Sequence, residues 1–213
     1  MSRILVFGAS ITYGEGDLKG GWVQRLRSYF DEKGISDPDF DYSVYNLGIS
    51  GDTTEDLLER FEFETLQRFQ EEKELIIFSI GHNDSQIFYN SKKTRTPTLQ
   101  FKENLQKLIN IARKFSTKII FIGLTPVDDL RVDPIPWFPK FSYKNESVKN
   151  FNNIIKRVCN KNRIYFIEIF EKWTSIDYKN LLEDGVHPNS EGHQKIFEIV
   201  RDFLIDNKIV HSF

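Results

Sequence analysis

The sequence predicts an α/β fold in which one parallel sheet of five strands is covered by helices on both faces. Five short apolar segments alternate along the 213 residues with five segments that repeat apolar residues at helical spacing. The first segment, residues 4–7, shows no alternation of polar and apolar residues, which is typical of a strand buried on both faces. Strands that alternate with helices favour a doubly wound parallel sheet.

The five predicted strands cover residues 4–7, 43–47, 75–80, 118–123 and 163–167. The first three run directly into small or polar residues, namely Gly8–Ser10, Gly48–Asp52 and Gly81–Asp84. In open α/β sheets, ligands bind outside the carboxyl ends of the strands. The residues after these strands are therefore the first candidates for a functional site.

The five predicted helices have apolar faces that repeat every three or four residues. These faces cover residues 22–30, 57–69, 101–115, 148–159 and 193–204. The spacing of Asp52 and Glu55 resembles a capping box for the second helix, and Asn189 is expected to cap the last one. No repeat or linker interrupts the pattern, so we expect one domain over residues 1–213.

Two long connections separate these elements. The polar segment from Ser85 to Thr98 exceeds an ordinary strand-to-helix loop, and such loops are usually lids or binding elements. A second connection, at 126–141, combines four prolines with Trp137, Phe138 and Phe141. It is interpreted as the wall of a pocket, with packing against the body of the protein as the alternative.

Composition excludes several classes of function. Lys and Arg number 29 against 31 Asp and Glu, and no basic run occurs, so a nucleic-acid partner is disfavoured. The single cysteine, Cys159, cannot form an internal disulfide and suits a reducing compartment. Four apolar residues before Gly8 are too few for a signal peptide or a membrane span, so a cytoplasmic protein is expected.

Five residues at the predicted sheet edge could together perform chemistry. Ser10, Gly48 and Asn83 follow three strands, and Asp184 and His187 lie in a late loop. Each alone has a structural explanation, as a helix cap, a turn residue or a surface histidine. Together they supply a nucleophile, a base, an acid that orients the base, and N–H donors for an oxyanion.

These residues lie in four short blocks: Phe7-Gly-Ala-Ser-Ile-Thr-Tyr-Gly14, Asn46-Leu-Gly48, Gly81-His-Asn-Asp84 and Asp184-Gly-Val-His187-Pro188. In residues and in order, they resemble the signature blocks of the SGNH (GDSL-type) hydrolases. The resemblance spans residues 7 to 188 and so covers nearly the whole chain.

The resemblance implies a flavodoxin-like, three-layer α/β/α fold and hydrolysis of a small or medium acyl ester through an acyl-enzyme, without a metal or cofactor. It assigns Ser10 as nucleophile, His187 as base and Asp184 as its orienting acid. It also assigns the oxyanion hole to the backbone N–H groups of Ser10 and Gly48 and the side-chain amide of Asn83. His82, Trp137 and Phe138 are added as possible residues of the substrate pocket.

One departure from the family pattern keeps alternatives open. The family places an aspartate before the nucleophile, whereas this chain has Ala9, and loss of that carboxylate would loosen the turn at Ser10. A catalytically silent binding module on the same scaffold is therefore an alternative. Acyl transfer and carbohydrate deacetylation use the same set of residues, and the sequence indicates neither the acyl chain nor the oligomeric state.

Overall fold

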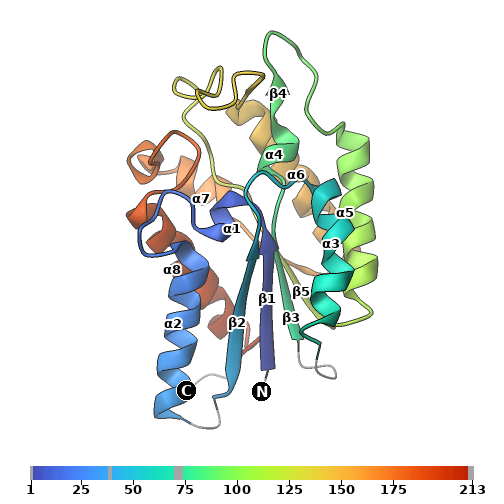
Figure 1. Ribbon diagram of the computed structural model, residues 1–213, viewed down its shortest axis with the longest axis vertical. Coiled ribbons are helices and arrows are strands. Elements are labelled where there is room, and N and C mark those ends of the chain that lie inside the picture. The colour runs from blue at the N-terminus through green and yellow to red at the C-terminus, as the bar shows by residue number, and fades with distance from the viewer. Residues whose placement is uncertain (1, 38–39, 70–73, 211–213) are drawn as a thin grey trace.

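A parallel five-stranded sheet forms the centre of the computed structural model, which describes residues 2–37, 40–69 and 74–210. The strand order is β2-β1-β3-β5-β7, and every neighbouring pair is parallel (Figure 1). The strands are β1 (Ser2–Gly8), β2 (Tyr42–Gly48), β3 (Glu74–Ser79), β5 (Lys118–Ile122) and β7 (Tyr165–Ile167). The predicted α/β/α architecture is confirmed.

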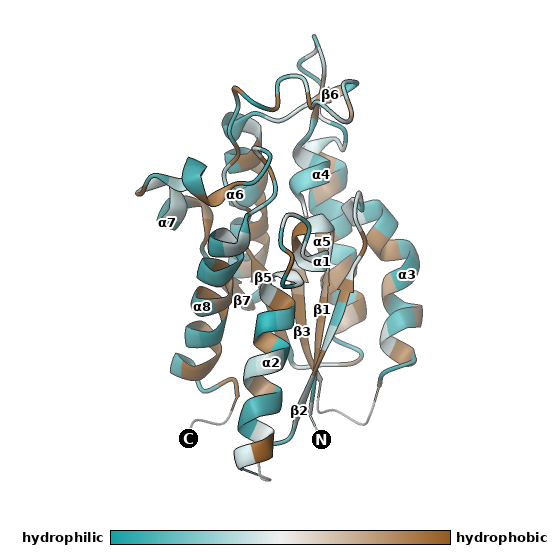
Figure 2. Cartoon of the chain, turned by 60° about the vertical axis from the view of Figure 1, so that its left-hand side comes forward, coloured by the Kyte–Doolittle hydropathy of each residue, from teal (hydrophilic) through white to brown (hydrophobic). Residues whose placement is uncertain are grey.

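Helices cover both faces of the sheet. The long helices are α2 (Gly21–Ser36), α3 (Thr54–Leu66), α5 (Thr98–Ala112), α6 (Asn145–Asn162) and α8 (Ser190–Asp206). Leu5 and Phe7 of β1 pack in one core with α3, α5 and α6, whereas Ile4 and Val6 pack in a second core with α2 and α8. Because successive side chains point to opposite faces, a strand buried on both is apolar throughout. The central strands β1 and β3 are accordingly hydrophobic in Figure 2, whereas the helices carry both hydrophobic and hydrophilic stretches.

The strand register brings the residues after the strands to one edge of the sheet. Gly8, the last residue of β1, pairs with Gly48 of β2 on one side and with Ser79 of β3 on the other. The segments that follow, which include Ser10 and Asn83, therefore leave the sheet at the same level. This edge is uppermost in Figure 1.

The two long connections contain short elements that the sequence did not predict. A two-stranded antiparallel sheet pairs β4 (Ile87–Phe88) with β6 (Phe141–Ser142) and so ties one connection to the other. The rings of Phe88 and Phe141 lie 4.7 Å apart. Strands of two residues are too short to produce a periodic pattern, so their pairing is visible only in three dimensions. The other short elements are α1 (Ser10–Tyr13), α4 (His82–Ser85), α7 (Phe170–Thr174) and the 3₁₀ helix η1 (Tyr178–Leu181).

Of the two predicted helix caps, that of α8 is confirmed and that of α3 is formed by other residues. The capping box of α3 is formed by Thr53 and Asp56 rather than by Asp52 and Glu55. Asp52 instead forms a salt bridge with Arg60 at 2.7 Å. Asn189 caps α8 as expected, because its side chain accepts hydrogen bonds from the backbone of the first turn.

Among the helices of residues 2–37, 40–69 and 74–210, none combines the length and apolar character needed to cross a membrane. Within the same ranges, no three His, Cys, Asp or Glu side chains are grouped so that they could hold a metal ion.

Candidate active site

Ser10 is presented by a tight turn between β1 and α1. A β-carbon at Gly8 would lie 2.0 Å from Oγ1 of Thr12 and 2.4 Å from the carbonyl oxygen of Ser79, so only glycine fits there. The chain turns directly into α1, which starts at Ser10. The close approach of strand and helix therefore fixes the position of the serine at the sheet edge.

The missing carboxylate at position 9 is not needed to hold this turn. Ala9 is buried and makes no side-chain cap, but its carbonyl accepts the N–H of Tyr13 at 2.9 Å. The carbonyl of Gly8 accepts the N–H of Ile49 at 3.1 Å and Nη2 of Arg60 at 3.2 Å. Backbone bonds and one arginine thus tie the turn to β2 and α3.

Ser10, His187 and Asp184 form a continuous hydrogen-bonded chain. Oγ of Ser10 lies 2.9 Å from Nε2 of His187, and Nδ1 of the same ring lies 2.6 Å from Oδ2 of Asp184. The other carboxylate oxygen of Asp184 accepts the backbone N–H groups of Val186 and His187 at 2.9 and 2.8 Å. The turn 184–187 therefore fixes both side chains, although Ser10 is 177 positions away in the sequence.

The charge of Asp184 determines which ring nitrogen of His187 carries the proton. Burial alone raises the pKa of Asp184, but hydrogen bonds from His187 and Val186 outweigh it and hold the pKa below its usual value. An ionised carboxylate only accepts hydrogen bonds, so Nδ1 of His187 carries a proton and donates a hydrogen bond to Asp184. Nε2 is then free to accept the hydroxyl proton of Ser10.

The side-chain amide of Asn83 is held with one N–H free. Its Nδ2 donates to the carbonyl oxygen of Asp52 at 2.9 Å, and its Oδ1 accepts hydrogen bonds from Tyr143 and Gln86. The amide nitrogen has a second N–H, and Asn83 lines the same cavity as Ser10. This leaves one donor available to a group bound beside the serine.

The prediction for Gly48 requires a correction. Its backbone N–H donates to Oδ1 of Asn46 at 3.0 Å, and Gly48 is not among the residues that line the cavity. A β-carbon there would lie 2.4 Å from the backbone nitrogen of Tyr13, so this glycine serves the close packing of β2 against α1.

Gly51, three residues later in the chain, lies in the cavity where Gly48 was expected. It lines the cavity together with Ser10 and Asn83, and its φ of +92° is one that glycine adopts readily. Within the described part of the chain, the backbone N–H groups of Ser10 and Gly51 have no acceptor. The only sequence signal for Gly51 was its position in the Gly48–Asp52 segment after β2.

A cavity of about 480 Å³ surrounds Ser10 and His187. Trp137 and Phe138 line it, as predicted, and the Trp137 ring lies 5.7 Å from the imidazole of His187. Sequence reasoning missed several other lining residues because they lie outside the four motif blocks: Glu15, Ser50, Gln86, Arg95 and Tyr143.

His82 does not belong to the cavity lining, which corrects the prediction of a pocket residue. Its Nε2 is instead surrounded by Thr125, whose carbonyl oxygen, N–H and hydroxyl lie 2.9, 3.1 and 3.1 Å away. Burial lowers the pKa of His82 to about 4, because the charged ring would lose its hydration. His82 therefore links α4 to the segment after β5 as a neutral ring.

This lowered pKa predicts a loss of stability in mild acid. In the unfolded chain, His82 takes up a proton near pH 6.5, whereas in the folded chain it does so only near pH 4. Between these values the unfolded state binds more protons at this site, so the contribution of His82 to the free energy of unfolding should decrease as the pH is lowered, by up to about 1.4 kcal/mol per pH unit. Urea titrations at several pH values across this window measure the slope.

The control for this prediction is His82→Gln, which cannot take up the proton. Its slope should be shallower than that of the parent. The slope that remains combines two opposite contributions, because burial lowers the pKa of His193 and raises the pKa of Asp84 to about 6. Equal slopes in the two proteins would contradict the assignment.

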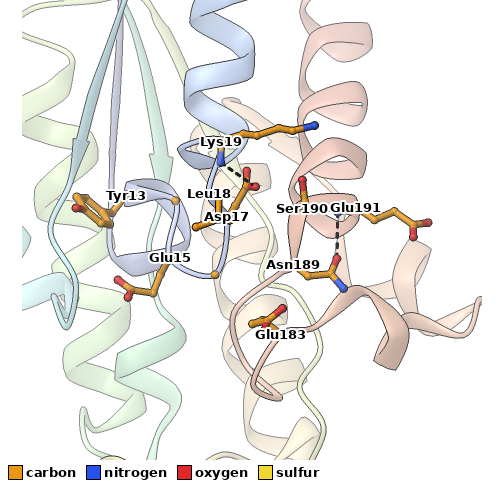
Figure 3. Close-up of a pocket in the computed structure, with 11 residues that line it drawn as sticks. Tyr13, Glu15, Asp17, Leu18, Lys19, Glu183, Asn189, Ser190 and Glu191 are labelled. Atoms are coloured by element: carbon orange, nitrogen blue, oxygen red, sulfur yellow. Dashed lines mark hydrogen bonds between the residues drawn. The ribbon is translucent and has the colours of Figure 1, made fainter.

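A second and larger cavity, of about 910 Å³, lies beside the first between residues 13–19 and 183–191 (Figure 3). Glu15 lines both cavities. Neither Ser10 nor His187 lines the larger one, which carries the acidic side chains of Asp17, Glu183 and Glu191. The groups that can perform nucleophilic chemistry therefore face the smaller cavity.

The chain is similar to known proteins over nearly its whole length. The profile of the GDSL-like Lipase/Acylhydrolase family matches residues 6–195, a range that contains all three members of the Ser10, Asp184 and His187 chain. Esterase TesA of Pseudomonas aeruginosa is 24% identical over 198 residues, which are 92% of this chain and 85% of that protein.

Solved structures share the fold. A lipase/acylhydrolase from Enterococcus faecalis superimposes with a TM-score of 0.75 at 23% identity, covering 96% of this chain and 95% of the other. An acetyl xylan esterase, AlAXEase, gives a TM-score of 0.75 at 21% identity, covering 95% and 100%.

Proposed function

This chain belongs to the GDSL-like Lipase/Acylhydrolase family and is a carboxylic ester hydrolase, and we propose that Ser10, His187 and Asp184 perform the reaction through an acyl-enzyme. The observation that carries the proposal is the hydrogen-bonded chain from Ser10 Oγ through both ring nitrogens of His187 to Asp184. It unites a nucleophile, its base and the acid that orients the base.

In the first half of the reaction, Oγ of Ser10 attacks the ester carbonyl carbon while Nε2 of His187 removes the hydroxyl proton. Asp184 stabilises the imidazolium that results and does not itself take the proton. The tetrahedral intermediate collapses when His187 gives this proton to the oxygen of the leaving alcohol. The products of this half are the free alcohol and an ester between the acyl group and Ser10.

In the second half, a water molecule takes the place of the alcohol. The water attacks the carbonyl carbon of the acyl-enzyme while His187 removes one proton from it. His187 then gives that proton to Oγ of Ser10 as the carboxylic acid leaves.

Both tetrahedral intermediates carry a negative oxygen that needs N–H donors. We assign these donors to the backbone N–H groups of Ser10 and Gly51 and to the free N–H of Asn83. All three residues line one cavity, and the two backbone groups have no acceptor in the described part of the chain. Donors held in place before the reaction stabilise the charge without reorganisation.

We propose a small or medium acyl ester as the substrate. The cavity of about 480 Å³ is of the size that holds a small ligand, and the exposed rings of Trp137 and Phe138 give it an apolar wall. Glu15 and Ser50 add polar groups that would contact the alcohol or the acyl portion.

Covalent labelling tests the proposal directly. A fluorophosphonate should react with Ser10, because His187 activates its hydroxyl, and peptide mass mapping should place the adduct on that residue. The parent should also hydrolyse p-nitrophenyl acetate, and a panel of longer acyl esters then measures chain-length preference.

Ser10→Ala is the control, and it should lose both labelling and turnover. An active parent that is labelled at a different serine would contradict the assignment of the nucleophile. A parent with neither labelling nor turnover would contradict the proposed function.

A further inference from the structure

The carbonyl oxygen of Asn83 is held by two side chains from the long connections. The hydroxyl of Tyr143 donates to Oδ1 at 2.9 Å, and Nε2 of Gln86 donates to the same oxygen at 3.3 Å. Because Nδ2 already donates to the carbonyl of Asp52, a 180° flip of the amide would break all three hydrogen bonds. Its one free N–H is therefore directed by Tyr143, Gln86 and Asp52.

Tyr143 and Gln86 are themselves fixed. Both are buried, and Nε2 of Gln86 donates to the hydroxyl oxygen of Tyr143 at 2.9 Å, so this hydroxyl accepts one bond and donates another. Burial raises the pKa of Tyr143 above its usual value, so the phenol keeps its proton. The hydroxyl thus remains a donor to Asn83 at every pH at which the protein would act.

Arg95 connects this pair to Gly51. Its Nη1 donates to Oε1 of Gln86 at 3.1 Å, and its Nη2 reaches the carbonyl oxygen of Gly51 at 3.4 Å. The guanidinium also lies over the ring of Phe141, 5.7 Å from its centre. The Arg95 backbone N–H donates to the carbonyl of Gln86, which fixes the base of the side chain. One side chain thereby contacts Gly51 directly and Asn83 through Gln86.

We propose that Gln86, Arg95 and Tyr143 form a clamp that positions two donors of the oxyanion hole, Asn83 and Gly51. The inference rests on the proposed function and assigns a task to the 85–98 connection beyond lining the cavity. The clamp residues are positioning residues: they act on the transition state through the direction of the Asn83 and Gly51 N–H groups. Preorganised donors lower the barrier only when their direction is fixed before charge develops.

Tyr143→Phe removes one hydroxyl and keeps the ring. It should lower kcat for p-nitrophenyl acetate by roughly threefold to tenfold, the effect of one neutral hydrogen bond, with KM changed by less than about twofold. Tyr178→Phe is the matched control, because it also removes a hydrogen-bonded hydroxyl, 3.1 Å from the Val127 carbonyl, but lies outside the cavity lining. Its kcat should equal that of the parent.

A double-mutant cycle separates positioning from a general structural effect. In an Asn83→Ala background, Tyr143→Phe should change kcat by less than about twofold, because the group that it positions is absent. Arg95→Ala should lower kcat in the parent and keep part of its effect in the Asn83→Ala background, because its contact with Gly51 remains. Gln86→Ala gives a second route to the same test if Tyr143→Phe unfolds, which circular dichroism monitors.

Two results would overturn the clamp while leaving the proposed function intact. One is an equal loss from Tyr143→Phe with and without Asn83. The other is a rise in KM at unchanged kcat, which would mean that Tyr143 contacts substrate. A parent without Ser10-dependent turnover contradicts the proposed function itself and the clamp with it.

Discussion

His187→Ala should lower kcat for p-nitrophenyl acetate by roughly 10⁴–10⁶, the range that removal of the base from such a triad produces. In the proposed reaction the imidazole removes the proton of Ser10 and later protonates the leaving oxygen, and no other group lies within hydrogen-bond distance of Oγ in the described residues. Steady-state kinetics over a range of substrate concentrations measure the loss in kcat. The residual rate should come from the oxyanion donors and substrate binding alone.

The other histidines of the described chain provide the control. His82→Gln should keep most of the turnover, because its ring contacts Thr125 and not the cavity. His193 bonds the Trp22 N–H and the Glu15 carbonyl, so its replacement should affect stability more than chemistry. If His187→Ala remains active while a change at His82 or His193 abolishes turnover, the base has been assigned to the wrong residue.

Asn83→Ala should lower kcat by roughly 10²–10³ with KM little changed, because its bond to the oxyanion strengthens as negative charge develops. The loss should exceed that of Tyr143→Phe, since it removes the donor itself rather than its support. Kinetics with p-nitrophenyl acetate at a temperature well below the unfolding midpoint measure it.

Two other outcomes for Asn83→Ala would give the residue a different role. A loss confined to KM would mean that Asn83 binds the substrate in its ground state. Near-normal kcat with a lowered unfolding temperature would mean that the amide serves only to connect Asp52, Gln86 and Tyr143. Either outcome would contradict its place in the oxyanion hole.

The sequence by itself determined the sheet and identified the residues that are proposed to react. Short, largely apolar segments between the helices identified all five strands of the sheet. In β1 and β5 the apolar run is continuous, because burial on both faces removes the polar residues from a strand. Ser10 follows β1 directly, and the spacing of Asp184 and His187 within one turn keeps acid and base together. Such local relations are written in neighbouring residues, so they could be inferred without coordinates.

Only the tertiary structure decided which groups surround and support Ser10, Asp184 and His187. Gly48 and Gly51 lie in the same short segment, and the direction of each backbone N–H depends on the local dihedral angles. The N–H of Gly48 is already bonded to the side chain of Asn46. The clamp joins Gln86, Arg95 and Tyr143 across 57 positions through the pairing of β4 with β6. Hydrogen bonds between such distant segments leave no periodic signal in a sequence, because only the folded chain brings the partners within reach.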